Sequence, residues 1–337
     1  MLSRSKLILL FALCGLTSEV IIAAELPRGF FVEDLNRQPP VPAFYNLETQ
    51  QLQDFPLRQS YDQFIDFVWD REHGTVLFSA RPTRKDPYRV YSKAWPDGEE
   101  KPIYENAVGP FRFLVSPDGK RLALQIMGFS AWPTIAVHDL ESQRTIALGQ
   151  GYSPDWSVDS RRLLYLKIPG ALPSWLYEYR VDTDTETLLI QEPVMEAVFT
   201  DDPDQILVKT ASQAKHCDIF QVWNRRKQRF TPFCLPEGAL DKKKCPLQRE
   251  IGVFPGHQFF FFKEAASTSE NDQARLVVTD VWGGRLQTLD PDDWKPSATA
   301  VEDTSLVVGE DPLYVLRADG TGGSREIPHA GFIRVRR

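Results

Sequence analysis

Short apolar stretches separated by compact turns recur along the chain, and the clearest example is Ser116–Leu124 (SPDGKRLAL). Apolar residues lie on both sides of the SPDG turn, in which proline presets one backbone dihedral and glycine accepts a positive φ. A second copy, Ser153–Leu166 (SPDWSVDSRRLLYL), follows about forty residues later with Val158-Asp159-Ser160 in place of Pro-Asp-Gly. Each copy predicts a β-hairpin.

Weaker copies consist of an apolar strand, an acidic or Pro/Gly turn and a second apolar strand. They are Val68–Phe78, Val198–Val208, Val253–Phe262 and Ala300–Val308. Successive turn centres lie 41 to 53 residues apart, and a second predicted hairpin follows each one, most clearly at Thr134–Leu148 and Trp175–Ile190. Two hairpins per unit of about 45 residues is the period of a β-propeller blade. We find no convincing helix after the N-terminal segment.

The two ends of the chain bear on the number of blades. Ala43–Phe55 has the pattern of a further second hairpin, and Gly331–Arg337 supplies one lone strand. A propeller has no exposed edge at its seam only if the ring closes, and pairing the C-terminal strand with the N-terminal hairpin achieves this. We therefore predict an all-β propeller of four-stranded antiparallel blades, with seven blades favoured. Six blades, with residues 25–58 as an extension, is the alternative.

The first residues have the order typical of an export signal. Arg4 and Lys6 precede the apolar run Leu7–Leu16, and a pair of alanines forms a small-residue cleavage site before Glu25. The run is short for a membrane span. We predict a signal peptide over residues 1–24.

Removal of that signal leaves one propeller domain, residues 25–337, in the periplasm or outside the cell. An uncleaved N-terminal anchor, or a lipid at Cys14, is the minor alternative. No other segment is long and apolar enough to cross a bilayer.

Composition narrows the class of partner. The chain is 42% apolar and 12% aromatic, which is enough to build a packed core. Its net charge is -7, and -8 once residues 1–24 are removed. An acidic chain is a poor candidate for nucleic acid, whose phosphates require a basic footprint.

Three cysteines remain in the mature chain, Cys217, Cys234 and Cys245. Cys217 and Cys234 flank a hairpin-like segment, so we predict a disulfide between them in an oxidising compartment. Cys245 competes for either partner, and three unpaired thiols is the alternative. A metal site is not expected, because only His216 lies close in sequence and zinc usually takes four ligands.

The SPDGKRLAL segment and the run Trp156–Arg162 (WSVDSRR) resemble the repeat of TolB-type propellers, in which a W-S-P-D-G-K/R pattern opens each blade. The likeness covers residues 60–310, with two specific copies. It implies a periplasmic or secreted propeller that binds a protein or peptide on one face, with the repeat tryptophan packed between blades. Residues 25–58 are too few for the N-terminal α/β domain of the namesake protein, which puts a Tol-complex role in doubt.

Local motifs for catalysis are absent from the sequence. No two of the five histidines lie within four residues of each other, and Gly128–Trp132 lacks the second glycine of a GxSxG elbow. Asp182–Glu186 lacks the later glycine and glutamate of a calcium loop. We predict no catalytic residue, metal or cofactor, although a site gathered from several blades would leave no local motif.

The connections between the second and third strands of each predicted blade are longer and more varied than the hairpin turns. Long loops on a rigid scaffold commonly carry binding. Arginine and aromatic side chains dominate interface energetics, so the candidates on these connections are Arg81, Arg84, Phe129, Trp132 and Trp175. The alternative is that the aromatic residues cap the blade cores.

The resulting prediction is an exported, non-catalytic scaffold for a protein or peptide partner. The first alternative is a lyase or glycosidase acting on a polysaccharide at the central channel. A sensor that binds a small ligand in the channel is the third candidate.

Overall fold

The computed structural model describes residues 28–34, 36, 41–70, 73–106, 109–128, 130–168, 174–212 and 217–232, and nine strands between residues 247 and 331. The predicted signal peptide, residues 1–24, lies outside the described residues. Within the described part the structure contains 27 strands and no helix. The prediction of an all-β chain of antiparallel sheets is confirmed for these residues.

Strand pairing divides the described strands into seven four-stranded units, here called A to G. Unit A contains β27 (Ala330–Gly331), β1 (Gly29–Asp34), β2 (Val41–Asn46) and β3 (Gln51–Asp54). Unit B contains β4 (Gln63–Asp70), β5 (Thr75–Arg81), β6 (Tyr88–Ala94) and β7 (Lys101–Asn106). Unit C contains β8 (Phe111–Val115), β9 (Arg121–Ile126), β10 (Thr134–Asp139) and the first half of β11 (Thr145–Trp156). Unit D contains the second half of β11, β12 (Arg162–Lys167), β13 (Trp175–Arg180) and β14 (Thr185–Ile190).

The remaining units repeat the same order. Unit E contains β15 (Val194–Phe199), β16 (Gln205–Ser212), β17 (Cys217–Asn224) and β18 (Arg229–Pro232). Unit F contains β19 (Leu247–Val253), β20 (Phe259–Ala265), β21 (Ala274–Asp280) and β22 (Arg285–Leu289). Unit G contains β23 (Ala298–Glu302), β24 (Ser305–Gly309), β25 (Leu313–Arg317) and β26 (Arg325–Ile327).

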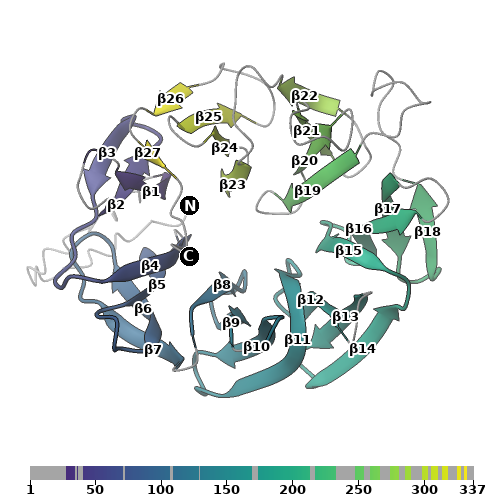
Figure 1. Cartoon of the computed structure of the whole chain (residues 1–337), viewed down its shortest axis with the longest axis horizontal. Helices are drawn as coiled ribbons and strands as arrows, with labels where there is room; N and C mark the ends of the chain where they lie inside the picture. The colour runs from purple at the N-terminus through teal and green to yellow at the C-terminus, as the bar shows by residue number, and fades with distance from the viewer. Residues whose placement is uncertain are drawn as a thin grey trace, which may run out of the picture.

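The units follow one another around a ring, with β4, β8, β15, β19 and β23 on the inner side of their units (Figure 1). Because each unit is an antiparallel meander, the turns between strands one and two and between strands three and four lie at one end of the sheet, here called the turn end. The connection between strands two and three lies at the opposite, link end. Of the long connections singled out in the sequence, the one after β5 and the described part of the one after β9 therefore lie at the link ends of their units.

Unit A combines the two ends of the described chain. β27 pairs antiparallel with β1, with Gly331 opposite Glu33 and Ala330 opposite Asp34. The hairpin expected over residues 43–55 is β2 and β3. β1 itself was not predicted, because its GFFVED sequence has no turn motif beside it. The sequence predicts a lone C-terminal strand over Gly331–Arg337. Its positions after Gly331 lie outside the described residues.

The repeated turn motif forms a defined hydrogen-bonded structure. Ser116 Oγ donates to Asp118 at 2.6 Å and accepts the Arg121 backbone N–H at 2.9 Å, while Gly119 adopts a positive φ of 69°. Ser157 repeats the first contact with Asp159 at 2.6 Å. Serine at the first position and aspartate at the third are thus fixed by the turn, because their side chains satisfy backbone groups that the reversing chain leaves unpaired.

Side chains from the innermost strands join neighbouring units. The Trp156 indole N–H of unit D donates to the Leu114 carbonyl of unit C at 3.2 Å, and Trp156 is buried in the core there. Asp155 accepts the backbone N–H of Phe199 in unit E at 2.7 Å. Asp66 of unit B receives the Phe113 backbone N–H of unit C, and desolvation raises its pKa to about 6. Trp156 therefore packs between two units, which is the role that the TolB resemblance implies for the repeat tryptophan.

Candidate functional site

The link end of unit B holds two of the predicted residues in one ion-pair cluster. Arg81, the last residue of β5, lies 2.8 Å from the Asp62 carboxylate, and Arg84 lies 3.5 Å from the other oxygen of Asp62. The Arg81 guanidinium also covers the Tyr88 ring at 4.9 Å. Arg84 is 87% exposed, so it remains available to a partner even while paired.

A second group of predicted residues lies on the link ends of units C and D. Trp132 stacks on Tyr152 with ring centroids 6.1 Å apart. Tyr152 and Ser174 share a hydrogen bond of 2.8 Å between their hydroxyls, and Ser174 donates to the Val194 carbonyl of unit E at 2.5 Å. These contacts form a continuous path across the link ends of three units. Trp175 follows Ser174 as the first residue of β13 and is half-buried.

No hydrogen bond, ion pair or ring contact between described residues joins these two groups. Phe129 lies outside the described residues. Cys217 begins β17 opposite Ser212, whereas Cys234 lies outside the described residues, so the disulfide remains a prediction.

Three exposed side chains at the link end were missed by the sequence reasoning. Met127 is 47% exposed in the connection after β9, and Met195 is 39% exposed at the start of β15. Arg112 is exposed on β8 between the buried Phe111 and Phe113. Arg112 and Met195 lie on the first strands of units C and E, whereas Met127 lies in the connection after the second strand of unit C. For Arg112 the signal available in the sequence was a charged residue between two phenylalanines, whereas the two methionines offered none.

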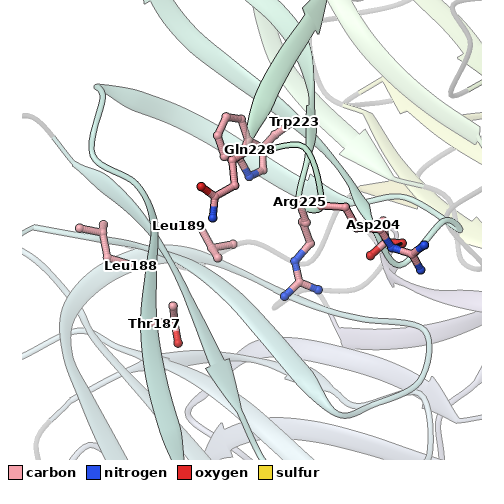
Figure 2. Close-up of a pocket in the computed structure, with 8 residues that line it drawn as sticks. Thr187, Leu188, Leu189, Asp204, Trp223, Arg225 and Gln228 are labelled. Carbon is pink, nitrogen blue, oxygen red and sulfur yellow. Dashed lines mark ion pairs between the residues drawn. The ribbon is translucent and has the colours of Figure 1, made fainter.

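A pocket of about 340 Å³ lies at the opposite, turn end, between the outer strands of units D and E. It is here called the Trp223 pocket and is lined by Thr187, Leu188, Leu189, Asp204, Trp223, Arg225, Arg226 and Gln228. The turn between β17 and β18 supplies its basic residues, and β14 supplies its apolar wall. Figure 2 shows the Arg225 guanidinium and the Gln228 amide extending into the space between that turn and β14.

The basic side of the Trp223 pocket is anchored in the sheet of unit D. Arg225 lies 2.7 Å from Glu178 and also donates to the Pro203 carbonyl at 3.3 Å. Glu178 is 2% exposed, and burial raises its pKa while Arg225 opposes that rise. Burial likewise lowers the pKa of Arg225. The pair therefore fixes the arginine in one position at the edge of the pocket.

No group of three or more His, Cys, Asp or Glu side chains close enough to hold a metal ion occurs in the described part of the chain. No helix there has the length and apolar character needed to cross a membrane.

Comparison with known proteins defines the class of fold. No protein-family model matches the chain, and no curated protein matches its sequence. Among solved structures, TolB from Acinetobacter baumannii is similar over 88% of this chain and 77% of its own, with a TM-score of 0.54 and 13% identity. The fold is thus that of a TolB-like β-propeller.

Enzymes share the same fold. A puromycin hydrolase is similar with a TM-score of 0.60 and 14% identity over 91% of this chain, which spans only 53% of the hydrolase. An oligogalacturonate lyase in complex with manganese is similar with a TM-score of 0.57 and 13% identity, over 89% of this chain and 84% of the lyase. At these identities the similarity shows the fold and leaves the function to the site.

Proposed function

We propose that the chain is an exported, seven-bladed propeller, with residues 1–24 as signal peptide and residues 25–337 as one domain whose ring is closed in unit A. The seven four-stranded units and the pairing of β27 with β1 support this proposal. Mass spectrometry of the exported protein should find Glu25 at the N-terminus. Deletion of residues 328–337 should lower the melting temperature, whereas an unchanged melting temperature would contradict closure by β27.

We infer that the propeller is a non-catalytic scaffold that binds a protein or peptide partner at its link end. The observation that carries this inference is the exposure of Met127, Met195 and Arg112 there, together with Arg84. Flexible thioether side chains adapt to irregular partner surfaces, and arginine supplies directional hydrogen bonds at an interface.

The rigidity of the surrounding surface supports binding. The path from Trp132 through Tyr152 and Ser174 to Val194 fixes the link ends of three units relative to one another. Side chains held in one position lose less conformational entropy when a partner binds. A preformed surface flanked by exposed methionines is therefore suited to protein recognition.

The test is quantitative affinity capture, after cross-linking, from the envelope fraction of the native host. Trp132→Ala and the double variant Met127→Ser/Met195→Ser should each reduce recovery of the partner about tenfold, which corresponds to about 1.4 kcal/mol. Arg144→Ala is the matched control, because Arg144 is 65% exposed at the turn end.

Equal recovery with all variants would overturn the link-end assignment. Cleavage of oligouronides by the purified protein, lost when acidic residues at the link end are substituted, would favour the lyase instead.

A further inference from the structure

The Trp223 pocket has more hydrogen-bond donors than its own residues can satisfy. The Trp223 indole N–H, the Arg225 Nε–H and the Gln228 amide donate no hydrogen bond within the described part of the chain. Arg226 uses only its Nε, on Asp204. Asp204 is the one carboxylate in the lining, and it is already paired. A ligand that supplies acceptors would therefore complement this pocket.

The charge of the pocket also favours a ligand that carries acceptors. Arg225 and Arg226 face a single lining carboxylate, Asp204. Behind Arg225, Glu178 is almost fully buried, and its second carboxylate oxygen has no hydrogen-bond partner. The accessible surface of the pocket therefore carries two guanidinium groups and one carboxylate, and it complements an anion.

The opposite wall belongs to an edge strand. β14 is the last strand of its sheet, so the backbone groups on its outer edge are not part of any ladder. A register shift in its pairing with β13 leaves Leu189 between the paired Leu188 and Ile190. Leu188 is 38% exposed, one of the few large apolar side chains so exposed in the described part. An edge strand next to an apolar side chain is the arrangement to which an extended peptide adds as a further strand.

We propose that the Trp223 pocket binds an extended peptide segment that places an aspartate or glutamate side chain on Arg225 and Arg226 while its backbone pairs with the outer edge of β14. The indole N–H of Trp223 and the amide of Gln228 complete the contacts to the carboxylate. This site lies at the turn end and is separate from the link-end surface proposed above. The propeller then carries two recognition surfaces on opposite ends.

The test uses a fluorescein-labelled hexapeptide, Val-Thr-Val-Asp-Val-Thr, with an amidated C-terminus, and matched peptides with Asn or Lys in place of Asp. Fluorescence polarisation on the purified mature protein should show that the Asp peptide binds at least about tenfold more tightly than the Asn peptide, with the Lys peptide weakest. Binding should weaken as salt increases, because the contact is ionic and partly exposed.

Two exposed positions test the pocket without disturbing the core. Leu188→Glu should weaken binding of the Asp peptide about tenfold, whereas Leu188→Lys should not weaken it. Arg226→Ala should also weaken it, since Arg226 is 81% exposed and removing its side chain leaves the sheet intact. Arg161→Ala is the matched control, an exposed arginine in a nearby turn that does not line the pocket.

Two glutamine variants test Arg225 itself. Glu178→Gln keeps the arginine and should retain binding. Glu178→Gln/Arg225→Gln removes the Arg225 charge without leaving a buried charge alone, and should reduce the discrimination between Asp and Asn to what Arg226 supplies. Equal binding of the Asp and Asn peptides to the wild type, or equal effects of Leu188→Glu and Leu188→Lys, would overturn the proposal. Trp132→Ala should leave this binding unchanged, so failure here and failure at the link end are separable.

Discussion

The junction between units A and B differs in kind from the junction between units D and E. At the first, Phe55 from the connection after β3 lies among the rings of Phe31, Phe67 and Trp95, at centroid distances of 5.1 to 6.2 Å. At the second, the buried pair Glu178–Arg225 crosses from one unit to the other. The aromatic junction is held by contacts between rings, whereas the charged junction has a pocket beside it.

The difference follows from what each side chain requires. Aromatic rings contact one another favourably at several tilts and need no polar partner, so they pack side by side in the core. A guanidinium requires acceptors in fixed directions and stays near water, so Arg225 ends at the surface with one group unused. The aromatic junction is therefore suited to stability and the charged junction to recognition.

Breaking the aromatic junction should have the largest effect. Phe55→Ala removes a side chain that is 6% exposed and should lower the free energy of unfolding by about 3–5 kcal/mol. Phe55→Leu, which retains most of the volume, should cost about 1–2 kcal/mol. Denaturant unfolding followed by tryptophan fluorescence measures both. A loss below about 1 kcal/mol for Phe55→Ala would show that the ring is not a core side chain.

Breaking the charged junction should have the next largest effect. Arg225→Ala leaves Glu178 buried and unpaired, and should cost about 3 kcal/mol, the lower end for a buried pair because Arg225 is 24% exposed. Glu178→Gln/Arg225→Gln should cost less, since no lone charge remains. If the double variant were as unstable as Arg225→Ala, the pair would be stabilising through packing alone.

The smallest effect expected is a difference between the wild type and Glu178→Gln in how stability depends on pH. Because the folded state raises the pKa of Glu178, the folded protein binds that proton more tightly than the unfolded chain does. The stability of the wild type relative to Glu178→Gln should therefore rise as pH falls from neutral towards the unfolded carboxyl pKa of about 4.3, and be lost as pH rises through the folded pKa. Phe55→Leu, measured as the control, should follow the wild type at every pH. If the free energy of unfolding of Glu178→Gln changed with pH in the same way as that of the wild type, the pKa of Glu178 would not be raised in the folded protein.

The repeat made much of the fold predictable. The Ser116 and Ser157 turns carry their own hydrogen-bond partners two residues away, so the hairpins could be located from local sequence alone. The link-end placement of Arg81 and Trp132 followed from the order of strands. β1 could not be found, because its identity depends on pairing with β2 and β27 instead of on a turn of its own.

The candidate sites were less predictable. Met127 and Met195 are ordinary apolar residues in the sequence, and their exposure depends on which units cover each strand. The Arg225-Arg226 dipeptide was visible only as part of a turn. Its partner Glu178 lies 47 residues earlier, in the neighbouring unit, and no local pattern connects the two.

The sequence by itself determined the all-β class, the spacing of the hairpins and the end of each sheet to which its long connections belong. These depend on contacts between residues close together in the chain, namely turn dihedrals and alternating burial. The tertiary structure alone decided that Trp223, Arg225 and Leu188 surround one pocket. That arrangement depends on the packing of one unit against the next, which brings together residues more than thirty positions apart.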